Sequence, residues 1–185
     1  IMDLGFLENS EQFRPFDYWQ LRLWSAYSIL ASNKILSISA QTASDIVRHY
    51  QFSKKKIKVT HLGYDSKVFN SDISKNEVDR VKNKYNIVNN YILFLSTLKP
   101  SKNIEGLLIA WSKLSQEYPT TSLVIAGKKG WLFESIFKKI VELGLQKKVV
   151  FTDFVDEKDK AGLIKGAKAF VLPSYWEGFG LDVLS

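Results

Sequence analysis

The sequence predicts an α/β protein built on a doubly wound parallel sheet. Four short apolar, β-rich runs occupy residues 91–96, 121–127, 148–154 and 167–173. Helical patterns, each closed by a proline or glycine signal, separate these runs at 104–118, 131–143 and 157–166. Strands and helices that alternate at this spacing form βαβ units, whose parallel strands are covered on both faces.

The first third of the chain is less regular. Seven apolar residues between Glu11 and Leu30 recur at spacings of three and four, which is typical of an amphipathic helix: Phe13, Phe16, Trp19, Leu23, Trp24, Tyr27 and Leu30. We expect Phe16, Trp19 and Trp24 in the core rather than on a binding platform. Two further strands are predicted at 34–40 and 56–63, with a helix between them that runs through Tyr50 and is capped by Ser39 or Thr42.

Composition excludes several classes of function. The 185 residues carry a formal net charge of +7 and no cysteine, so disulfides, thiolate metal sites and cysteine nucleophiles are absent. The positive charge is spread along the chain, and we expect no nucleic-acid partner. No apolar run approaches the roughly 20 residues that span a bilayer. His49 and His61 lack ligand spacing and predict no metal site.

In doubly wound sheets the ligand crevice lies beyond the carboxyl ends of the strands. The loop after the first run places Lys102 and Asn103 at the start of a helix, where free N–H groups and the helix dipole attract an anion. Taken alone, a lysine before a helix is more often a solvated loop residue. The loop 127–130 begins at Gly127 and reads more readily as a plain turn than as a ligand loop, and it lacks the P-loop spacing.

Two other loops follow strands at the same edge. In 153–156 we expect Asp156 to cap the next helix, and a backbone contact with a nucleobase is the alternative. In 173–180, Gly178 and Gly180 allow the backbone to approach a ligand closely, and Glu177 offers a carboxylate to sugar hydroxyls. A strand-to-helix turn with a surface glutamate fits that loop equally well.

Three motifs occur in a specific order: PSKN, LVIAGKKGW and PSYWEGFG. With them, residues 91–185 resemble the carboxyl-terminal nucleotide-sugar domain of the family 4 (group 1) retaining glycosyltransferases, and residues 37–65 resemble the end of that family's amino-terminal domain. The resemblance implies a GT-B enzyme of two facing Rossmann-like halves. Residues 1–66 would belong to the acceptor-side half, 67–90 to the linker and its helix, and 91–185 to an incomplete nucleotide-sugar-binding half.

The resemblance also implies roles for individual residues. Lys102 matches the lysine that holds the donor diphosphate, and Glu177 matches the first glutamate of the E-x7-E motif, near the transferred hexose; we take these two as the catalytic candidates. The remaining donor-binding candidates are Thr97, Asn103, Gly127, Val155, Gly178, Phe179, Gly180 and Leu181.

Several positions depart from the family pattern. The second glutamate of the motif falls at Ser185, Ser96 stands where many members have glycine, and Asp182 replaces a common proline. Thr97 replaces a frequent arginine. The threonine variant resembles a mannosyltransferase-like branch, which makes GDP-mannose the donor that we expect.

The expected function is transfer of a hexose, with retention, from a nucleotide sugar to a saccharide or lipid-linked saccharide in cell-surface polysaccharide biosynthesis. We expect no cofactor and no metal, and a cytoplasmic location with a peripheral contact at the inner membrane face left open. The chain is expected to be an inactive piece of a longer enzyme. A noncatalytic module that binds nucleotide sugars or phosphosugars is the alternative.

Overall fold

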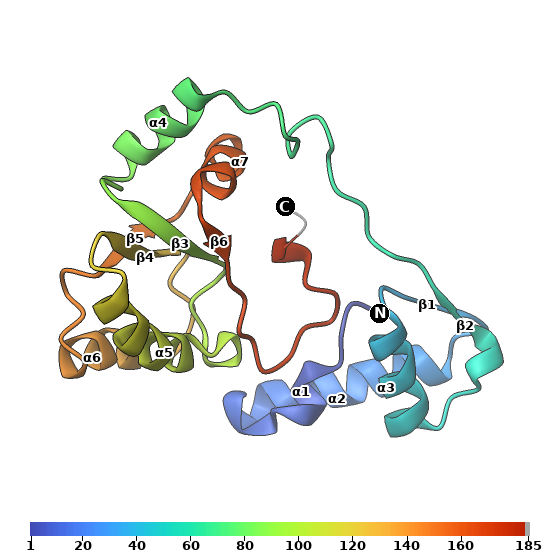
Figure 1. Ribbon diagram of the computed structural model, residues 1–185. Coiled ribbons are helices and arrows are strands. Elements are labelled where there is room, and N and C mark those ends of the chain that lie inside the picture. The colour runs from blue at the N-terminus through green and yellow to red at the C-terminus, as the bar shows by residue number, and fades with distance from the viewer. Residues whose placement is uncertain (184–185) are drawn as a thin grey trace. The chain divides into compact units, whose positions relative to one another are not determined.

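The computed structural model describes residues 1–183 and divides the chain into two compact units (Figure 1). The first unit contains Ile1–Gly63 and Trp176–Leu181, and the second contains Tyr64–Tyr175 and the chain from Asp182. Each unit therefore consists of two segments that are separate in the sequence. The ranges predicted from the sequence, 1–66, 67–90 and 91–185, are each a single continuous segment.

The second unit contains a four-stranded parallel sheet. Its strands are β3 (Asn90–Leu95), β4 (Thr121–Ala126), β5 (Val149–Asp153) and β6 (Ala169–Phe170), and their order is β5-β4-β3-β6. β3 pairs with β4 along its whole length and with β6 on its other side. The four predicted strands are confirmed, and the chain reverses its direction of travel across the sheet after β5.

Helices cover both faces of this sheet (Figure 1). One face carries α5 (Ile104–Glu117) and α6 (Glu134–Glu142), and the other carries α4 (Lys75–Lys84) and α7 (Glu157–Gly166). The arrangement is doubly wound, which confirms the predicted α/β fold class. It also explains why the strands are apolar at consecutive positions rather than at alternate ones.

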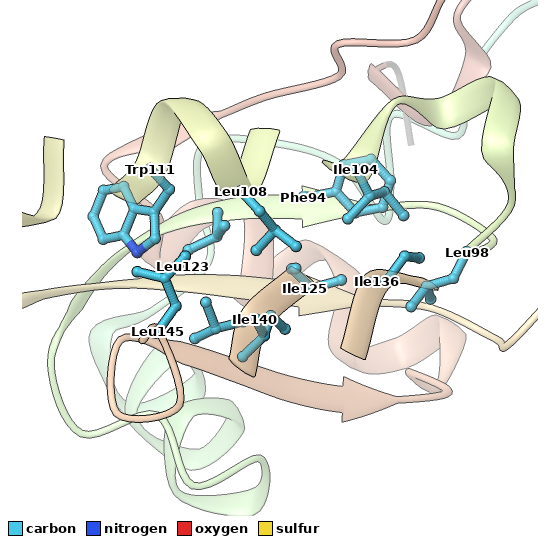
Figure 2. Close-up of a cluster of buried hydrophobic side chains, with 11 residues drawn as sticks. Phe94, Leu98, Ile104, Leu108, Trp111, Leu123, Ile125, Ile136, Ile140 and Leu145 are labelled. Carbon is cyan, nitrogen blue, oxygen red and sulfur yellow. The ribbon is translucent and has the colours of Figure 1, made fainter. Parts of the chain in front are cut away.

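Two separate apolar cores result from the alternation of side chains along β4. Leu123 and Ile125 face α5 and α6, whereas Val124 and Ala126 face α4 and α7. Figure 2 shows the first core, in which Leu108 and Trp111 of α5 lie over the sheet. Because successive side chains of a strand point to opposite faces, a single run of six residues supplies both cores.

An ionic cluster joins α4 to α7. The Asp159 side chain has no exposed surface, and it accepts hydrogen bonds from Arg80, Lys84 and the Tyr85 hydroxyl. Arg80 and Lys84 are one turn apart on α4, so both reach the same carboxylate. Burial raises the pKa of Asp159, but the three donors outweigh burial and bring the pKa down to about 2.

The first unit contains a parallel pair of short strands, β1 (Ile35–Ser37) and β2 (Ile57–Val59), with helices α1 (Gly5–Glu8), α2 (Pro15–Leu30) and α3 (Ala40–Tyr50). Short 3₁₀ turns occur at η1 (Ser10–Gln12) and η2 (Lys54–Lys56) in this unit and at η3 (Pro100–Lys102) in the other, and η4 is Leu181–Val183. Ser39 caps α3 as predicted, since its hydroxyl accepts the Thr42 N–H at 3.0 Å.

The predicted burial of the α2 aromatic residues is wrong. The helix itself forms, but Phe16, Trp19 and Trp24 are 76%, 55% and 66% exposed. The opposite side of the helix, which includes the buried Ile29, packs on the core of the first unit. Periodicity identifies an apolar helix face, but it does not decide which side meets the core. Among residues 1–183, no helix has the length and apolarity that a bilayer crossing requires.

Candidate functional site

A pocket of about 210 Å³ opens at the carboxyl edge of β3, β4 and β5 in the second unit. We call it the edge pocket, and its lining consists of Leu95, Ser96, Thr97, Gly127, Lys128, Phe154, Val155, Lys160 and Asp182. Most of these residues lie at or just after the strand ends, in loops that the sequence analysis selected. The pocket therefore lies on the side of the sheet where doubly wound proteins bind ligands.

Gly127 allows the loops after β3 and β4 to pack closely at the edge pocket. Its φ is +140°, and a Cβ atom would lie 1.9 Å from the Ser96 carbonyl oxygen, so no other residue fits without moving the backbone. Beyond this contact, Leu98 N–H donates to the Lys128 carbonyl, and Gly130 N–H donates to the Leu98 carbonyl, each at 2.9 Å. These bonds hold the loops after β3 and β4 in one fixed arrangement.

Lys102 is a buried cation beside this pocket. It lies at the end of η3 (Pro100–Lys102), and its side chain is only 8% exposed. The Nζ atom donates to Asp182 Oδ2 at 3.0 Å. This burial shows that the alternative of a solvated loop lysine is wrong. A buried ammonium group needs nearby acceptors or negative charge, and Asp182 supplies both.

Asn103 positions the start of α5. Its φ and ψ of 52° and 39° lie in the left-handed region, which asparagine tolerates better than most residues. The side chain makes no capping bond and instead donates from Nδ2 to the Pro173 carbonyl at 3.2 Å. A second bond, from Tyr175 N–H to the Ser101 carbonyl at 2.9 Å, joins the same two loops.

These two loops leave neighbouring strands at the place where the strand order reverses. β3 has β4 on one side and β6 on the other, and β6 follows the crossover through α7. In open α/β sheets this reversal is where ligands bind. The first turn of the 14-residue helix α5 presents backbone N–H groups here, with the positive end of the helix dipole.

The structure brings several predicted donor-binding residues together. Thr97 is exposed, Val155 is 2% exposed, and both line the edge pocket with Gly127. Asp156 stands at the N-cap position of α7 but makes no side-chain cap; Lys84 donates to its carboxylate instead. The predicted capping bond is therefore wrong, because a lysine competes for that carboxylate.

The segment Trp176–Leu181, which we call the glutamate turn, groups with the first unit. A Cβ atom on Gly178 would lie 2.4 Å from the Met2 carbonyl oxygen, so only glycine fits there. Gly180 has a φ of +78°, which also favours glycine. Glu177 is half-buried in this turn, as is Phe179. Because Lys102 belongs to the second unit, its convergence with Glu177 on one ligand stays a prediction, and Ser185 lies outside the described residues.

Each histidine contacts a neighbouring side chain. The His61 ring lies 5.8 Å from the Phe179 ring, and His49 Nε2 lies 2.7 Å from Glu8 Oε1. Within residues 1–183, no group of three histidine, aspartate or glutamate side chains is placed to hold a metal ion.

Sequence reasoning missed some residues of the edge pocket. Lys128 lies with its Nζ 4.8 Å from the centre of the Phe154 ring, and Lys160 adds another cation to the lining. Ser96 donates to Asp182 Oδ2 at 2.7 Å. Ser96 and Asp182 were both noted as departures from a family pattern, but they are 86 positions apart, and nothing in one sequence shows that they pair.

Comparison with known proteins identifies the family. The family model described as "Glycosyl transferases group 1" matches residues 75–184, which is more than half of the chain. The chain belongs to the group 1 glycosyltransferases. The match runs from α4 through the last described turn and so takes in the edge pocket, Lys102 and the glutamate turn.

Related sequences of this group 1 glycosyltransferase include two from Escherichia coli. The O-antigen chain mannosyltransferase B is 32% identical over 180 residues, which is 94% of this chain and 46% of that protein. The serotype-specific mannosyltransferase WbdA is 30% identical over 159 residues, which is 83% of this chain and 19% of WbdA. The chain thus spans less than half the length of either relative.

Two solved structures share the fold of this chain. WaaG, a glycosyltransferase involved in lipopolysaccharide biosynthesis, gives a TM-score of 0.77 with 16% identity over 98% of this chain and 50% of WaaG. HepE from Anabaena, solved with UDP and glucose, gives 0.70 with 19% identity over 83% of this chain and 41% of HepE. At these identities the likeness concerns the fold.

Proposed function

We propose that the full-length protein transfers a hexose, with mannose favoured, from a nucleotide-sugar donor to a saccharide or lipid-linked saccharide acceptor with retention of anomeric configuration. The reaction would serve cell-surface polysaccharide biosynthesis. Family membership and two mannosyltransferase relatives support the type of reaction. The threonine at position 97, in the loop after β3, resembles the mannosyltransferase-like branch of the family and supports GDP-mannose as the donor.

The observation that carries the proposal is the position of Lys102. A buried ammonium group lies beside a pocket at the strand-order reversal, next to the N-terminus of α5. A diphosphate needs a cation and N–H donors in a site with little water, where each contact is stronger than on an open surface. Lys102 and the first turn of α5 offer both at one place.

We also propose partners for the other parts of the donor. The edge pocket offers Thr97 and the backbone at Gly127 to phosphates, and the loop at Val155 offers backbone groups to the nucleobase. Glu177 would accept hydrogen bonds from hexose hydroxyls, and the backbone of Phe179, Gly180 and Leu181 would meet the sugar and phosphates.

The chemistry that these groups must supply is electrostatic. Departure of the diphosphate leaves an oxocarbenium-like sugar, and the leaving group gains negative charge as the glycosidic bond breaks. Lys102 and the helix terminus are fixed before the reaction, so they stabilise that charge without reorganising. We propose no carboxylate as a covalent nucleophile.

Binding and turnover together test this function against the alternative module. The full-length protein is titrated by calorimetry with GDP-mannose, UDP-glucose and UDP-galactose, and hydrolysis or transfer is then followed with the donor that binds. Turnover in the presence of an acceptor supports the transferase. Binding without any turnover favours a noncatalytic nucleotide-sugar or phosphosugar module, and absence of binding contradicts both.

The role of Lys102 has a matched control in Lys148. Lys102→Met removes the cation at the carboxyl edge, and we expect donor affinity to fall about 10- to 100-fold, the usual worth of a charged hydrogen bond. Lys148 lies just before β5, at the opposite edge of the sheet, and its Nζ donates to the Pro119 carbonyl at 2.6 Å. Lys148→Met should leave donor affinity unchanged, so equal affinities in all three proteins would contradict the assignment.

Two finer parts of the proposal have their own tests. We propose that transfer needs no metal ion, and turnover that disappears in excess chelator and returns with added magnesium would overturn this. We also place the reaction in the cytoplasm, with the contact at the inner membrane face kept as a prediction. Cosedimentation of the full-length protein with anionic vesicles tests that contact, and recovery in the supernatant alone contradicts it.

A further inference from the structure

The edge pocket contains an anion of its own. The Asp182 side chain lines the pocket, and its Oδ2 accepts hydrogen bonds from Lys102 Nζ at 3.0 Å and from Ser96 Oγ at 2.7 Å. The Asp182 side chain is 37% exposed, whereas that of Lys102 is 8% exposed. One oxygen of a partly exposed carboxylate therefore contacts the buried cation that we assign to the donor diphosphate.

The pairing has a clear electrostatic reason. A buried ammonium group loses its hydration, and a nearby carboxylate with a direct hydrogen bond compensates for that loss. Asp182 contributes to this compensation through its hydrogen bond to Lys102 Nζ. A phosphate oxygen that approaches the same Nζ meets a second negative charge beside it, and two anions at one cation repel each other.

We propose that Asp182 is a specificity-determining residue, an internal counter-ion that competes with the donor diphosphate for Lys102. This inference rests on the function proposed above. Ligands that engage Lys102 through phosphate must displace the carboxylate, and ligands that bind through the nucleoside alone do not. Asp182 therefore lowers the affinity for nucleoside diphosphates and leaves the affinity for the nucleoside unchanged.

The position of Asp182 allows it to leave the cation. It lies in the three-residue turn η4 (Leu181–Val183), and its carboxylate already has access to water. Ser96 supplies the second hydrogen bond, so it strengthens the hold of the carboxylate on the pocket without adding charge. Ser96 and Asp182, the two positions where the family resemblance implies a frequent glycine and a common proline, therefore contact each other.

Calorimetric titration of the full-length protein tests the proposal with three variants. Asp182→Asn removes the competing charge, and Ser96→Ala removes one bond to it. Glu142→Gln is the control, because Glu142 accepts from Lys139 at 2.8 Å on α6, outside the edge pocket. GDP and UDP are the diphosphate probes, and guanosine and uridine are the probes without phosphate.

We expect Asp182→Asn to bind the preferred diphosphate about 10-fold more tightly and Ser96→Ala about 2- to 3-fold more tightly, since one competing charged contact is lost or weakened. The dissociation constant of the nucleoside should be the same in all variants, and Glu142→Gln should match the parent protein. If Asp182→Asn does not fold, the diphosphate affinity of Ser96→Ala decides. Tighter binding than in the parent protein supports the proposal, and equal or weaker binding overturns it.

Each outcome has one meaning. A parent protein that binds GDP or UDP, with Asp182→Asn binding it equally or more weakly, overturns the inference and leaves the proposed function intact. Absence of diphosphate binding in the parent and in every variant contradicts the proposed function and the inference with it. Binding that appears only in Asp182→Asn supports the inference. An equal gain for the nucleoside overturns it, because the effect would then not act through Lys102.

Discussion

Replacing Asp159 with asparagine should destabilise the second unit measurably. The carboxylate is fully buried between α7 and α4, and its donors come from Arg80, Lys84 and Tyr85. Burial acts to raise the pKa of Asp159, and the donors lower it from 3.8 to about 2. Since each tenfold change in proton affinity is worth about 1.4 kcal/mol, the charged form contributes about 2 kcal/mol to folding.

The pH dependence of this contribution is fixed by the direction of the shift. The folded protein binds the Asp159 proton more weakly than the unfolded chain, so the stabilisation is complete above pH 3.8. It is lost as the pH falls from 3.8 toward 2, the pKa of the folded state. The difference in stability between the parent protein and Asp159→Asn should therefore be constant at neutral pH and shrink across this acidic range.

Urea unfolding followed by circular dichroism provides the measurement. We expect Asp159→Asn to lose about 2 kcal/mol at pH 7, because the Arg80 and Lys84 side chains are 45% and 39% exposed and stay hydrated when the carboxylate charge is removed. Asp156→Asn is the matched control, because Asp156 shares Lys84 but is 48% exposed, and surface pairs contribute about 0 to 1 kcal/mol. Equal losses in the two variants, or a loss for Asp159→Asn that is independent of pH down to 2, would refute the reasoning.

Three further predictions concern single contacts. Tyr91→Phe should cost about 1 to 3 kcal/mol in urea unfolding, because the buried hydroxyl donates to the Leu163 carbonyl at 2.6 Å; a loss below about 0.5 kcal/mol would contradict this. Ser39→Ala should lose about 1 kcal/mol through the missing cap of α3, with Ser39→Thr retaining most of it. On α2, Trp24→Ser should change stability by less than about 0.5 kcal/mol, whereas Ile29→Ala should cost about 2 to 5 kcal/mol. A larger loss for Trp24→Ser than for Ile29→Ala would support the predicted burial of the aromatic residues of this helix.

Much of the second unit is readable from the sequence because each element is locally encoded. The run 123–126 is apolar throughout, since it is buried on both faces, and that pattern is typical of a central parallel strand. The glycine at 127 marks the end of this strand in the sequence. The structure gives its reason, because the Ser96 carbonyl leaves no space for a side chain there. The loops that line the edge pocket were therefore predictable from the alternation of strands and helices.

The features that the sequence did not reveal depend on distant partners. The α2 helix has apolar residues on more than one side, and only the packing of the first unit selects the side of Ile29. Lys102 reads as a solvated lysine until its burial is known. Nothing near Asp159 in the sequence indicates its ionic partners, because Arg80 and Lys84 belong to a helix more than 70 positions earlier.

The proposed function depends above all on Lys102 binding the diphosphate of an activated sugar at the carboxyl edge of the sheet. A crystal structure of the full-length protein with a bound nucleoside diphosphate tests it most directly. We expect a phosphate oxygen within about 3.2 Å of Lys102 Nζ, with the Asp182 carboxylate displaced from that atom. Phosphates that contact other cations, with Lys102 still paired to Asp182, would contradict it.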